Sequence, residues 1–282
     1  MNNPVELSQQ VIDAAVKAAL VEDLGDVGDI TCKALIPEGL QSTASIVARA
    51  DGVLSGLPCA LTALRMVDDT LKVTCHKKDG DVLNVGDVIA TLQGNSRSIL
   101  TAERTALNFL THLSGISTLT ARFVKEVAGT KAKILCTRKT HAGLRALEKY
   151  AVRLGGAINH RFGLYDAVLI KDNHLAVVGS IRAAVEKARA AVGKTIKVEI
   201  EVDSLLQLRE ALATDADIIM LDNFNINDLR QAVVTTRGRV PLEASGGINL
   251  QTVRSVAETN VNYISVGAIT HSAQALDIAL DF

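Results

Sequence analysis

The sequence predicts an α/β protein whose C-terminal half forms an α/β barrel of parallel strands rather than a large open sheet. Of its 282 residues, 48% are hydrophobic and 22% are charged, which is typical of a globular protein with a buried core. From residue 132 onward, short apolar runs alternate with amphipathic runs, as strands and helices do in a parallel sheet. About six such units occur, whereas a full barrel has eight, so the predicted barrel can be incomplete.

The N-terminal part of the chain has a mixed pattern. An amphipathic helix is expected first, followed by short strand-like segments between residues 44 and 94 with hairpin turn signals at Asp51-Gly52 and Asp79-Gly80. A second helix is expected to begin at about Thr101. The apolar residues that share one face of the first helix are Val11, Ala14, Ala15 and Ala18.

The C-terminal part of the chain supplies the alternating units. The apolar runs that we expect to be strands are 134–136, 167–170, 198–202, 217–221, 240–244 and 263–266. The amphipathic runs that we expect to be helices are 143–155, 180–192, 204–213, 226–236 and 250–258. In the helix at 180–192, the residues at helical spacing on one face are Ile181, Ala184, Val185, Ala188 and Val192.

Charge, cysteines and hydropathy exclude several classes of protein. The net charge of -1, with no block of Lys and Arg, argues against a general nucleic-acid surface. The four cysteines are widely spaced, without a CxxC pair, as expected of reduced thiols. No segment approaches the roughly 20 apolar residues of a membrane span, and the N-terminus lacks the apolar core of a signal peptide. We therefore expect a cytoplasmic protein with no nucleic-acid or membrane partner.

A polar or glycine-containing segment follows the apolar core of each predicted strand. These segments are Thr137-Arg138-Lys139, Lys171-Asp172-Asn173-His174, Glu201 with Asp203, Asp222-Asn223, Ser245-Gly246-Gly247 and Gly267. In barrels and in open α/β sheets, the carboxyl ends of the strands converge on the active site. The sequence therefore predicts one site built from all six strand ends.

The residue types in this predicted site indicate a phosphorylated, anionic substrate. Cations at Arg138, Lys139, Arg161 and Lys171 suit a ligand with several negative charges. The small residues Ser245-Gly246-Gly247 and Val266-Gly267-Ala268 would let backbone amides approach a phosphate.

Two acidic residues add a second function to the predicted site. Glu201 and Asp222 can hold sugar hydroxyls, bind Mg²⁺ or stabilise a positive sugar centre in a transition state. The sequence alone thus predicts an enzyme that acts on a phosphosugar or polyphosphate with Mg²⁺.

Ordinary structural functions explain other polar residues near the strand ends. We expect Glu199 to face away from Glu201 and to form a structural ion pair. His141 and His271 lie near strand ends without further support for a function. His174 either orients a neighbour or ends a strand.

Six motifs resemble those of quinolinate phosphoribosyltransferases, a family also called carboxylating nicotinate-nucleotide pyrophosphorylases. In chain order they are TRKTHAGLRALEKYAVRLGG, HRFGLYDAVLIKDNH, VEIEVDS, IIMLDNF, LEASGGI and VGAITHS. The likeness covers nearly the whole chain, including EDLGDVGDIT and ERTALNFL near its start. One departure is His141-Ala142 before Gly143, where a Pro is expected directly before the glycine of this turn.

The resemblance implies a reaction and a domain organisation. Quinolinate and phosphoribosyl pyrophosphate would give nicotinate mononucleotide, pyrophosphate and CO₂, a step of NAD biosynthesis. An N-terminal α/β sandwich domain would span residues 1–114 and the barrel residues 115–282, with residues about 270–282 packing back on the first domain. The family resemblance also implies a homodimer, with larger assemblies left open, in which the partner's N-terminal domain closes the site.

The resemblance also implies a function for each matching residue. Those that would bind the two carboxylates of quinolinate are Arg138, His160, Arg161 and Lys171, with Arg104 reaching in from the neighbouring subunit. Lys139 would contact the phosphates of the sugar substrate, and Thr137 would also belong to the substrate-binding residues. Glu201 and Asp222 would face the ribose and its Mg²⁺, and the loops Ser245-Gly246-Gly247 and Val266-Gly267-Ala268 would hold the 5′-phosphate. The resemblance therefore implies catalysis by Glu201, Asp222, Lys139 and Lys171.

Two other functions fit the same fold. One is a relative that accepts nicotinate or another base without decarboxylation, which would not need Arg161 and Arg104 for a second carboxylate. The other is a non-catalytic protein that binds anions at the barrel rim, for which the full set of acidic and basic residues would be superfluous.

Overall fold

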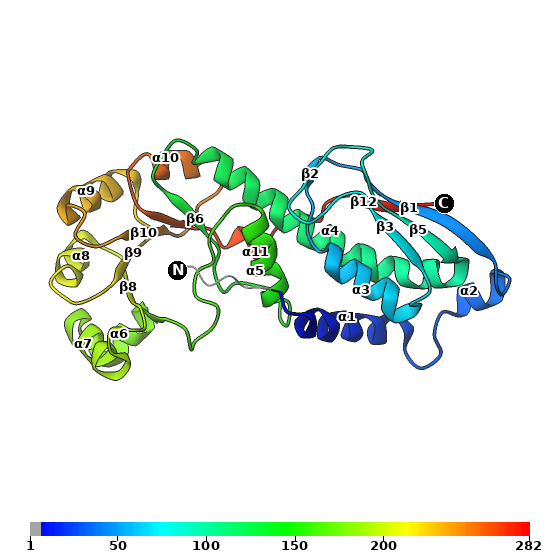
Figure 1. Ribbon diagram of the computed structural model, residues 1–282. Helices are drawn as coiled ribbons and strands as arrows, with labels where there is room; N and C mark the ends of the chain where they lie inside the picture. The colour runs from blue at the N-terminus through cyan, green and yellow to red at the C-terminus, as the bar shows by residue number, and fades with distance from the viewer. Residues whose placement is uncertain (1–6) are drawn as a thin grey trace. The chain divides into compact units, whose positions relative to one another are not determined.

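The structure, a computed structural model, describes residues 7–282 and consists of two compact units (Figure 1). The barrel unit contains residues 122–139 and 157–268. The sandwich unit contains residues 7–121, 140–156 and 269–282. The two units are thus interleaved along the chain, whereas the predicted domain boundary at residues 114 and 115, a single cut, stays a prediction.

The barrel unit is built on a sheet of six parallel strands in the order β6-β11-β10-β9-β8-β7. Its strands are β6 (Lys133–Leu135), β7 (Val168–Ile170), β8 (Val198–Val202), β9 (Ile218–Asp222), β10 (Leu242–Ser245) and β11 (Tyr263–Ser265). The strand that comes first in the chain pairs with the last one, so the order is cyclic, as in a barrel. Ile158 adds a parallel bridge to Leu135 of β6. Within residues 7–282, no strand pairing joins residue 158 to β7, and the predicted incomplete α/β barrel is confirmed.

The composition of the strands explains their position. Ile200, Ile219 and Leu221 are fully buried, because neighbouring strands and the outer helices cover both faces of a parallel sheet. The outer helices are α6 (Asp172–Val178), α7 (Ile181–Val192), α8 (Leu205–Ala211), α9 (Ile226–Thr236) and α10 (Val253–Ala257) (Figure 1). Of the predicted apolar face of α7, Ile181, Ala184 and Val185 are buried, whereas Ala188 and Val192 are partly exposed.

The first helical run of the predicted alternation does not cover the barrel. The helix α5 (Arg145–Leu154) belongs to the sandwich unit, and the short helix α6, which the sequence did not predict, follows β7 instead. The segment 159–167 between Ile158 and β7 forms no strand and occupies the open position of the ring. This segment carries His160 and Arg161, and it therefore presents two predicted site residues at the opening of the barrel.

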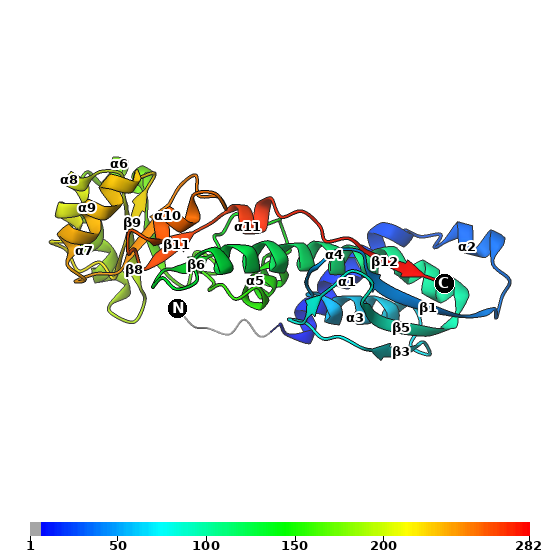
Figure 2. The same ribbon diagram turned by 90° about the horizontal axis from the view of Figure 1, so that it is seen from above.

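The sandwich unit contains an antiparallel sheet in the order β12-β1-β5-β3 and a two-stranded sheet of β2 and β4. Its strands are β1 (Gln41–Ala48), β2 (Gly52–Val53), β3 (Lys72–Cys75), β4 (Val82–Leu83), β5 (Val88–Asn95) and β12 (Ile278–Asp281). Its helices are α1 (Gln9–Leu24), α2 (Ile30–Leu35), α3 (Leu57–Val67), α4 (Ser96–Glu126, whose last residues enter the barrel unit), α5 and α11 (Ala268–His271). Figure 2 shows β12, from the C-terminal end of the chain, alongside β1.

The predicted apolar face of the first helix is wrong. Ile12, Val16 and Leu20 are the buried residues of α1, whereas Val11 and Ala14 are exposed. Both sets recur at helical spacing, but the larger side chains remove more apolar area from water when they are buried. The larger side chains therefore determine which face packs.

The helices α4 and α5 pack closely through small residues and one buried carboxylate. A Cβ atom on Gly155 would lie 2.5 Å from the backbone oxygen of Ser117. Glu148, which is fully buried, accepts hydrogen bonds from His112 Nε2 at 2.9 Å and His141 Nδ1 at 2.6 Å. His141 therefore belongs to a hydrogen-bonded cluster of the sandwich unit.

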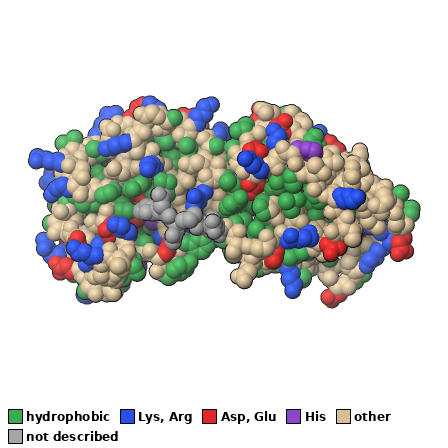
Figure 3. Space-filling view, in the orientation of Figure 1, with side chains coloured by type: hydrophobic (Ala, Val, Ile, Leu, Met, Phe, Trp, Pro, Cys, Tyr) green, Lys and Arg blue, Asp and Glu red, His purple; other side chains and the backbone are tan. Residues whose placement is uncertain are grey.

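The distribution of charged side chains and the hydropathy of the helices can be compared with the expectations from the sequence. On the face drawn in Figure 3, Lys and Arg side chains are interspersed with Asp and Glu on both units. Among residues 7–282, no helix has both the length and the apolar character that crossing a membrane requires.

Candidate active site

The barrel unit contains all but one of the predicted site residues. Those in this unit are Thr137, Arg138, Lys139, His160, Arg161, Lys171, Glu201, Asp222, Ser245, Gly246, Gly247, Val266, Gly267 and Ala268. Apart from His160 and Arg161, they lie at the carboxyl ends of strands or directly after them. Arg104 lies on α4 in the sandwich unit, where its side chain is exposed and has the carboxylate of Glu103 at 3.8 Å.

Lys171 and Glu201 form an ion pair at the ends of two adjacent strands. The Nζ atom of Lys171, after β7, donates to Oε2 of Glu201 on β8 at 2.9 Å. The Glu201 side chain is 12% exposed and that of Lys171 is 46% exposed, so the cation lies nearer to solvent. A ligand anion can therefore approach the lysine while the carboxylate stays fixed behind it.

His174 has a structural function in presenting this lysine. Its Nδ1 atom accepts a hydrogen bond from the backbone N–H of Lys171 at 2.9 Å. The backbone N–H of His174 in turn donates to the carbonyl of Lys171, also at 2.9 Å. The histidine thus fixes the turn that leads from β7 into α6, which corresponds to the expected orientation of a neighbour.

Arg138 and Arg161 are close enough for their charges to interact. Burial and, secondly, the charge of Arg138 lower the pKa of Arg161 from its ordinary value, although Glu199 and Asp166 partly compensate. Arg161 also donates from one terminal nitrogen to the carbonyl of Ala167 at 3.1 Å, within the open segment of the ring. A like-charged pair of this kind is favoured by an anion that binds both groups.

His160 is buried at the barrel opening with both ring nitrogens engaged. Nε2 lies 2.9 Å from Oε2 of Glu199, and Nδ1 accepts the backbone N–H of Arg161 at 2.8 Å. Since Nδ1 is an acceptor, the ring proton is on Nε2 and points to the carboxylate. A direct contact of this ring with substrate stays a prediction, and its hydrogen bonds inside the protein give it another function.

The expectation that Glu199 faces away from Glu201 is wrong. The two residues are two positions apart on β8 and so share one face of the strand. The carboxylate of Glu201 is close enough to act on the pKa of Glu199. The partner of Glu199 is His160, at 2.9 Å, and the expected ion pair would require this histidine to be protonated.

The loop after β10 packs closely against the end of β9, a contact that we call the interlock. Asn223 has a left-handed backbone with φ of 57°, donates from its backbone to the carbonyl of Ser245 at 2.9 Å, and donates from Nδ2 to Asp222 at 2.7 Å. Gly246 has φ of 95°, and a Cβ atom there would lie 2.1 Å from Oδ1 of Asn223. Only glycine fits this position, which keeps the loop close to Asp222.

Two adjacent glycines make this interlock testable. Gly246→Ala is expected to destabilise the protein by more than about 2 kcal/mol, because backbone strain adds to the collision with Asn223. Gly247→Ala is the matched control, since its φ of 62° adds strain but a Cβ atom there meets nothing within 4 Å. The free energy of unfolding, measured by urea denaturation, should fall clearly more for the first variant. Equal losses would contradict the interlock.

The carboxylates of Glu201 and Asp222 suit Mg²⁺ as oxygen ligands on neighbouring strands. Glu201 is already held by Lys171 and Asp222 by the amide of Asn223. Two carboxylates do not form a complete cage, but Mg²⁺ usually binds through one or two carboxylates together with substrate phosphates. The donor set therefore fits a metal ion that arrives with a phosphorylated substrate.

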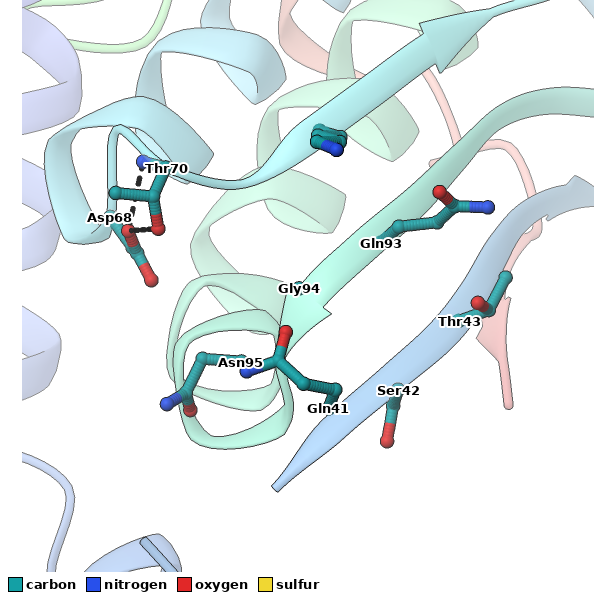
Figure 4. A pocket seen from close by; sticks show the side chains of 9 residues that line it. Gln41, Ser42, Thr43, Asp68, Thr70, Gln93, Gly94 and Asn95 are labelled. Carbon is teal, nitrogen blue, oxygen red and sulfur yellow. Dashed lines mark hydrogen bonds between the residues drawn. The ribbon is translucent and has the colours of Figure 1, made fainter. Parts of the chain in front are cut away.

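A polar depression in the sandwich unit does not belong to this site (Figure 4). Its volume is about 600 Å³, and it lies on the sheet of β1, β5 and β3. Asp68 in its wall accepts hydrogen bonds from the backbone and the hydroxyl of Thr70. None of its lining residues is a predicted site residue.

Sequence reasoning missed one buried residue of the barrel interior. Glu243 on β10 is fully buried, 3.6 Å from Nε2 of His160, and Ser265 on β11 donates a short hydrogen bond to it. The signal was a glutamate inside the apolar run VPLEA, which can stay buried only with partners.

The fold and the site define a class of enzyme. Cations, two carboxylates and glycine loops gather at the carboxyl edge of an α/β barrel, as required to transfer a phosphorylated sugar, so the class is that of phosphoribosyltransferases. Models of the N-terminal and C-terminal domains of quinolinate phosphoribosyl transferase match residues 29–114 and 116–281. The chain belongs to the quinolinate phosphoribosyltransferase family, and the predicted family is confirmed.

Individual relatives agree over almost the whole chain. The nicotinate-nucleotide pyrophosphorylase (carboxylating) of Mycobacterium leprae is 47% identical over 283 residues, covering 98% of this chain and 99% of that protein. A mitochondrial quinolinate phosphoribosyltransferase (decarboxylating) of Nicotiana tabacum is 41% identical and covers 94% of this chain and 80% of its own length. The structure of the nicotinate-nucleotide pyrophosphorylase from Francisella tularensis has a TM-score of 0.95 at 41% identity, covering 100% of this chain and 99% of that one.

Proposed function

We propose that the protein transfers the phosphoribosyl group of phosphoribosyl pyrophosphate to quinolinate with decarboxylation, forming nicotinate mononucleotide, pyrophosphate and CO₂ in NAD biosynthesis. The observation that carries this proposal is the gathering of cations and carboxylates at the carboxyl ends of the barrel strands, with Arg161 close enough to Arg138 for the two charges to interact. Two guanidinium groups suit a substrate with two adjacent carboxylates. The names of the relatives from Mycobacterium leprae and Nicotiana tabacum support the same reaction.

The charges at the rim support a mechanism without a covalent intermediate on the protein. The bond between C1 of the ribose and the pyrophosphate oxygen breaks, and its electron pair leaves with pyrophosphate. The nitrogen lone pair of quinolinate forms the new bond to C1, and Glu201 and Asp222 stabilise the positive charge on the sugar in between. Mg²⁺ held by these carboxylates and by the substrate phosphates would neutralise the leaving pyrophosphate.

Decarboxylation follows from the charge of the substituted ring. Once the ring nitrogen carries a positive charge, the bond to the neighbouring carboxylate can break, leaving its electron pair on the ring carbon as CO₂ departs. That carbon then takes up a proton. Arg138, Arg161 and Lys171 contribute by holding both carboxylates in place, so that catalysis rests on positioning and electrostatics.

The direct test is incubation of the purified protein with quinolinate, phosphoribosyl pyrophosphate and Mg²⁺. We expect nicotinate mononucleotide and CO₂ in equal amounts. Nicotinate in place of quinolinate is the control, because a relative that does not decarboxylate would convert nicotinate to the nucleotide without releasing CO₂. If quinolinate yields neither product, the proposal is wrong, and if nicotinate is used better, the enzyme is a non-decarboxylating relative.

The remaining partners are part of the same proposal. Arg104 would reach the site of the neighbouring subunit in a homodimer, which its exposed position on α4 permits. Lys139 and the loops at Ser245–Gly247 and Val266–Ala268 would hold the phosphates of the sugar substrate. We place the reaction in the cytoplasm on the basis of the sequence.

Mixing two inactive variants tests the contribution of Arg104. Arg104→Ala and Glu201→Gln are each expected to be nearly inactive. If Arg104 acts across a dimer interface, reassembled mixed dimers contain one intact site, and an equimolar mixture should recover about a quarter of the wild-type activity. No recovery after verified subunit exchange would indicate that Arg104 acts within its own chain.

A further inference from the structure

The interior of the barrel contains a buried polar group that the proposed mechanism does not use. Glu199 and Glu243, on strands β8 and β10, have side chains that are 4% and 0% exposed. Their partners are His160, whose Nε2 lies 2.9 Å from Glu199 and 3.6 Å from Glu243, and Ser265, which donates to Glu243. One ring nitrogen of His160 and one carboxylate oxygen of each glutamate all lie within 4.8 Å of one another.

Each of the two carboxyl groups has one buried oxygen that lacks a hydrogen-bond donor. Oε1 of Glu199 and Oε2 of Glu243 have no hydrogen-bond donor among the described residues. A proton held between the two carboxyl groups would give both oxygens a partner without adding buried charge. Burial is the first cause that raises the pKa of both carboxyl groups.

A chain of contacts leads from this pair to the candidate substrate site. Glu199 accepts a hydrogen bond from the Nε2–H group of His160, and Nδ1 of the same ring then acts as an acceptor. Nδ1 of His160 accepts a hydrogen bond from the backbone N–H of Arg161 at 2.8 Å. The side chain of Arg161 donates a hydrogen bond to the carbonyl of Ala167. This segment forms no strand, so these hydrogen bonds replace the sheet pairing that fixes the other site residues.

We propose that Glu243 is a positioning residue for dicarboxylate recognition: together with Glu199 it fixes the ring of His160, and the ring fixes Arg161. The proposal rests on the proposed function, in which Arg161 binds a carboxylate of quinolinate. It assigns His160 to the support of Arg161 and extends the site into the barrel interior. Loss of Glu243 should therefore affect quinolinate more than the sugar substrate.

Two substitutions of Glu243 separate positioning from packing. Glu243→Gln keeps the size and a donor toward Glu199, whereas Glu243→Leu keeps the volume but removes every hydrogen bond. We expect Glu243→Leu to raise KM for quinolinate about 10-fold, with KM for phosphoribosyl pyrophosphate changed less than about twofold. Glu243→Gln should restore the quinolinate KM to within about threefold of wild type.

A matched control removes another buried polar group of the same unit. Thr259 follows α10 and is buried, and its hydroxyl donates to the carbonyl of Val256 in that helix. Thr259→Val should lower thermal stability without changing the ratio of the two KM values. If Glu243→Leu behaves like this control, or if both KM values rise together, Glu243 is only structural and the proposal is wrong.

Nitrogen-15 NMR of the His160 ring gives a second readout that needs no activity. In the wild-type protein without substrate we expect the neutral tautomer with the proton on Nε2, and in Glu243→Leu a mixture of tautomers. A wild-type ring with its proton on Nδ1 would overturn the proposal, even if Glu243→Leu were too unstable for kinetics. A wild-type enzyme without activity would contradict the proposed function. If the wild-type enzyme is active and Glu243→Leu leaves the ratio of the two KM values unchanged, only this inference is wrong.

Discussion

Replacing Arg161 with alanine should raise KM for quinolinate about 100-fold, which corresponds to about 3 kcal/mol. The guanidinium of Arg161 is half-buried, so a carboxylate bound there would lose a charge-assisted partner that water replaces poorly. KM for phosphoribosyl pyrophosphate should change little, because the sugar phosphates are assigned to residues at the strand ends. Steady-state kinetics with each substrate varied in turn measures both values.

The control for Arg161→Ala is an arginine of the same unit that lies away from the rim. Arg230 is exposed on α9, and Arg230→Ala should leave both KM values unchanged. Arg161→Lys should give an intermediate quinolinate KM, since it keeps the charge but loses the planar fork of donors. If Arg161→Ala weakened binding of the sugar substrate and left quinolinate unaffected, the assignment of Arg161 would be wrong.

Glu201→Gln should lower kcat by about 10²–10³ without raising KM for quinolinate. The carboxylate would stabilise positive charge that exists on the sugar only in the transition state. Glu201 also holds Lys171 at 2.9 Å, so its neutralisation releases a cation that can still bind the anionic substrate. Single-turnover kinetics would show whether the chemical step is the one that slows.

An exposed glutamate of the barrel unit provides the control for this variant. Glu258 lies 2.8 Å from Arg254 with its side chain 52% exposed, and Glu258→Gln should change neither kcat nor stability appreciably. A Glu201→Gln enzyme with wild-type kcat and a raised quinolinate KM would show that Glu201 acts in binding only.

The fold of the barrel could be predicted because its signal is local and repeated. All six strands fall within two residues of their predicted ends, since an apolar run that is covered on both faces has few alternatives. The short helix α6 could not be predicted in the same way. Its residues Asp172–Val178 contain no buried side chain, so no apolar periodicity marks it, and its start depends on the hydrogen bonds between Lys171 and His174.

The site was predictable in part for a similar reason. Strand ends converge in any parallel barrel, so Lys171, Glu201 and Asp222 could be grouped before the structure was known. The partners of His160 could not be predicted, because Glu199 and Glu243 lie on two strands that are separated by β9 in the sheet. Which buried carboxyl groups meet depends on strand order and on side-chain length across the barrel interior, which the sequence pattern does not specify.

The cyclic strand order also has a consequence for how the protein folds. Strand β6 needs β11 as its neighbour, and β1 needs β12, with Arg49 and Asp281 forming an ion pair across 232 residues of sequence. Neither sheet can be completed before almost the whole chain has left the ribosome. Such distant pairings slow folding and expose unpaired strand edges while synthesis continues. We expect removal of the last five residues to lower the yield of soluble protein, although none of these residues belongs to the candidate active site.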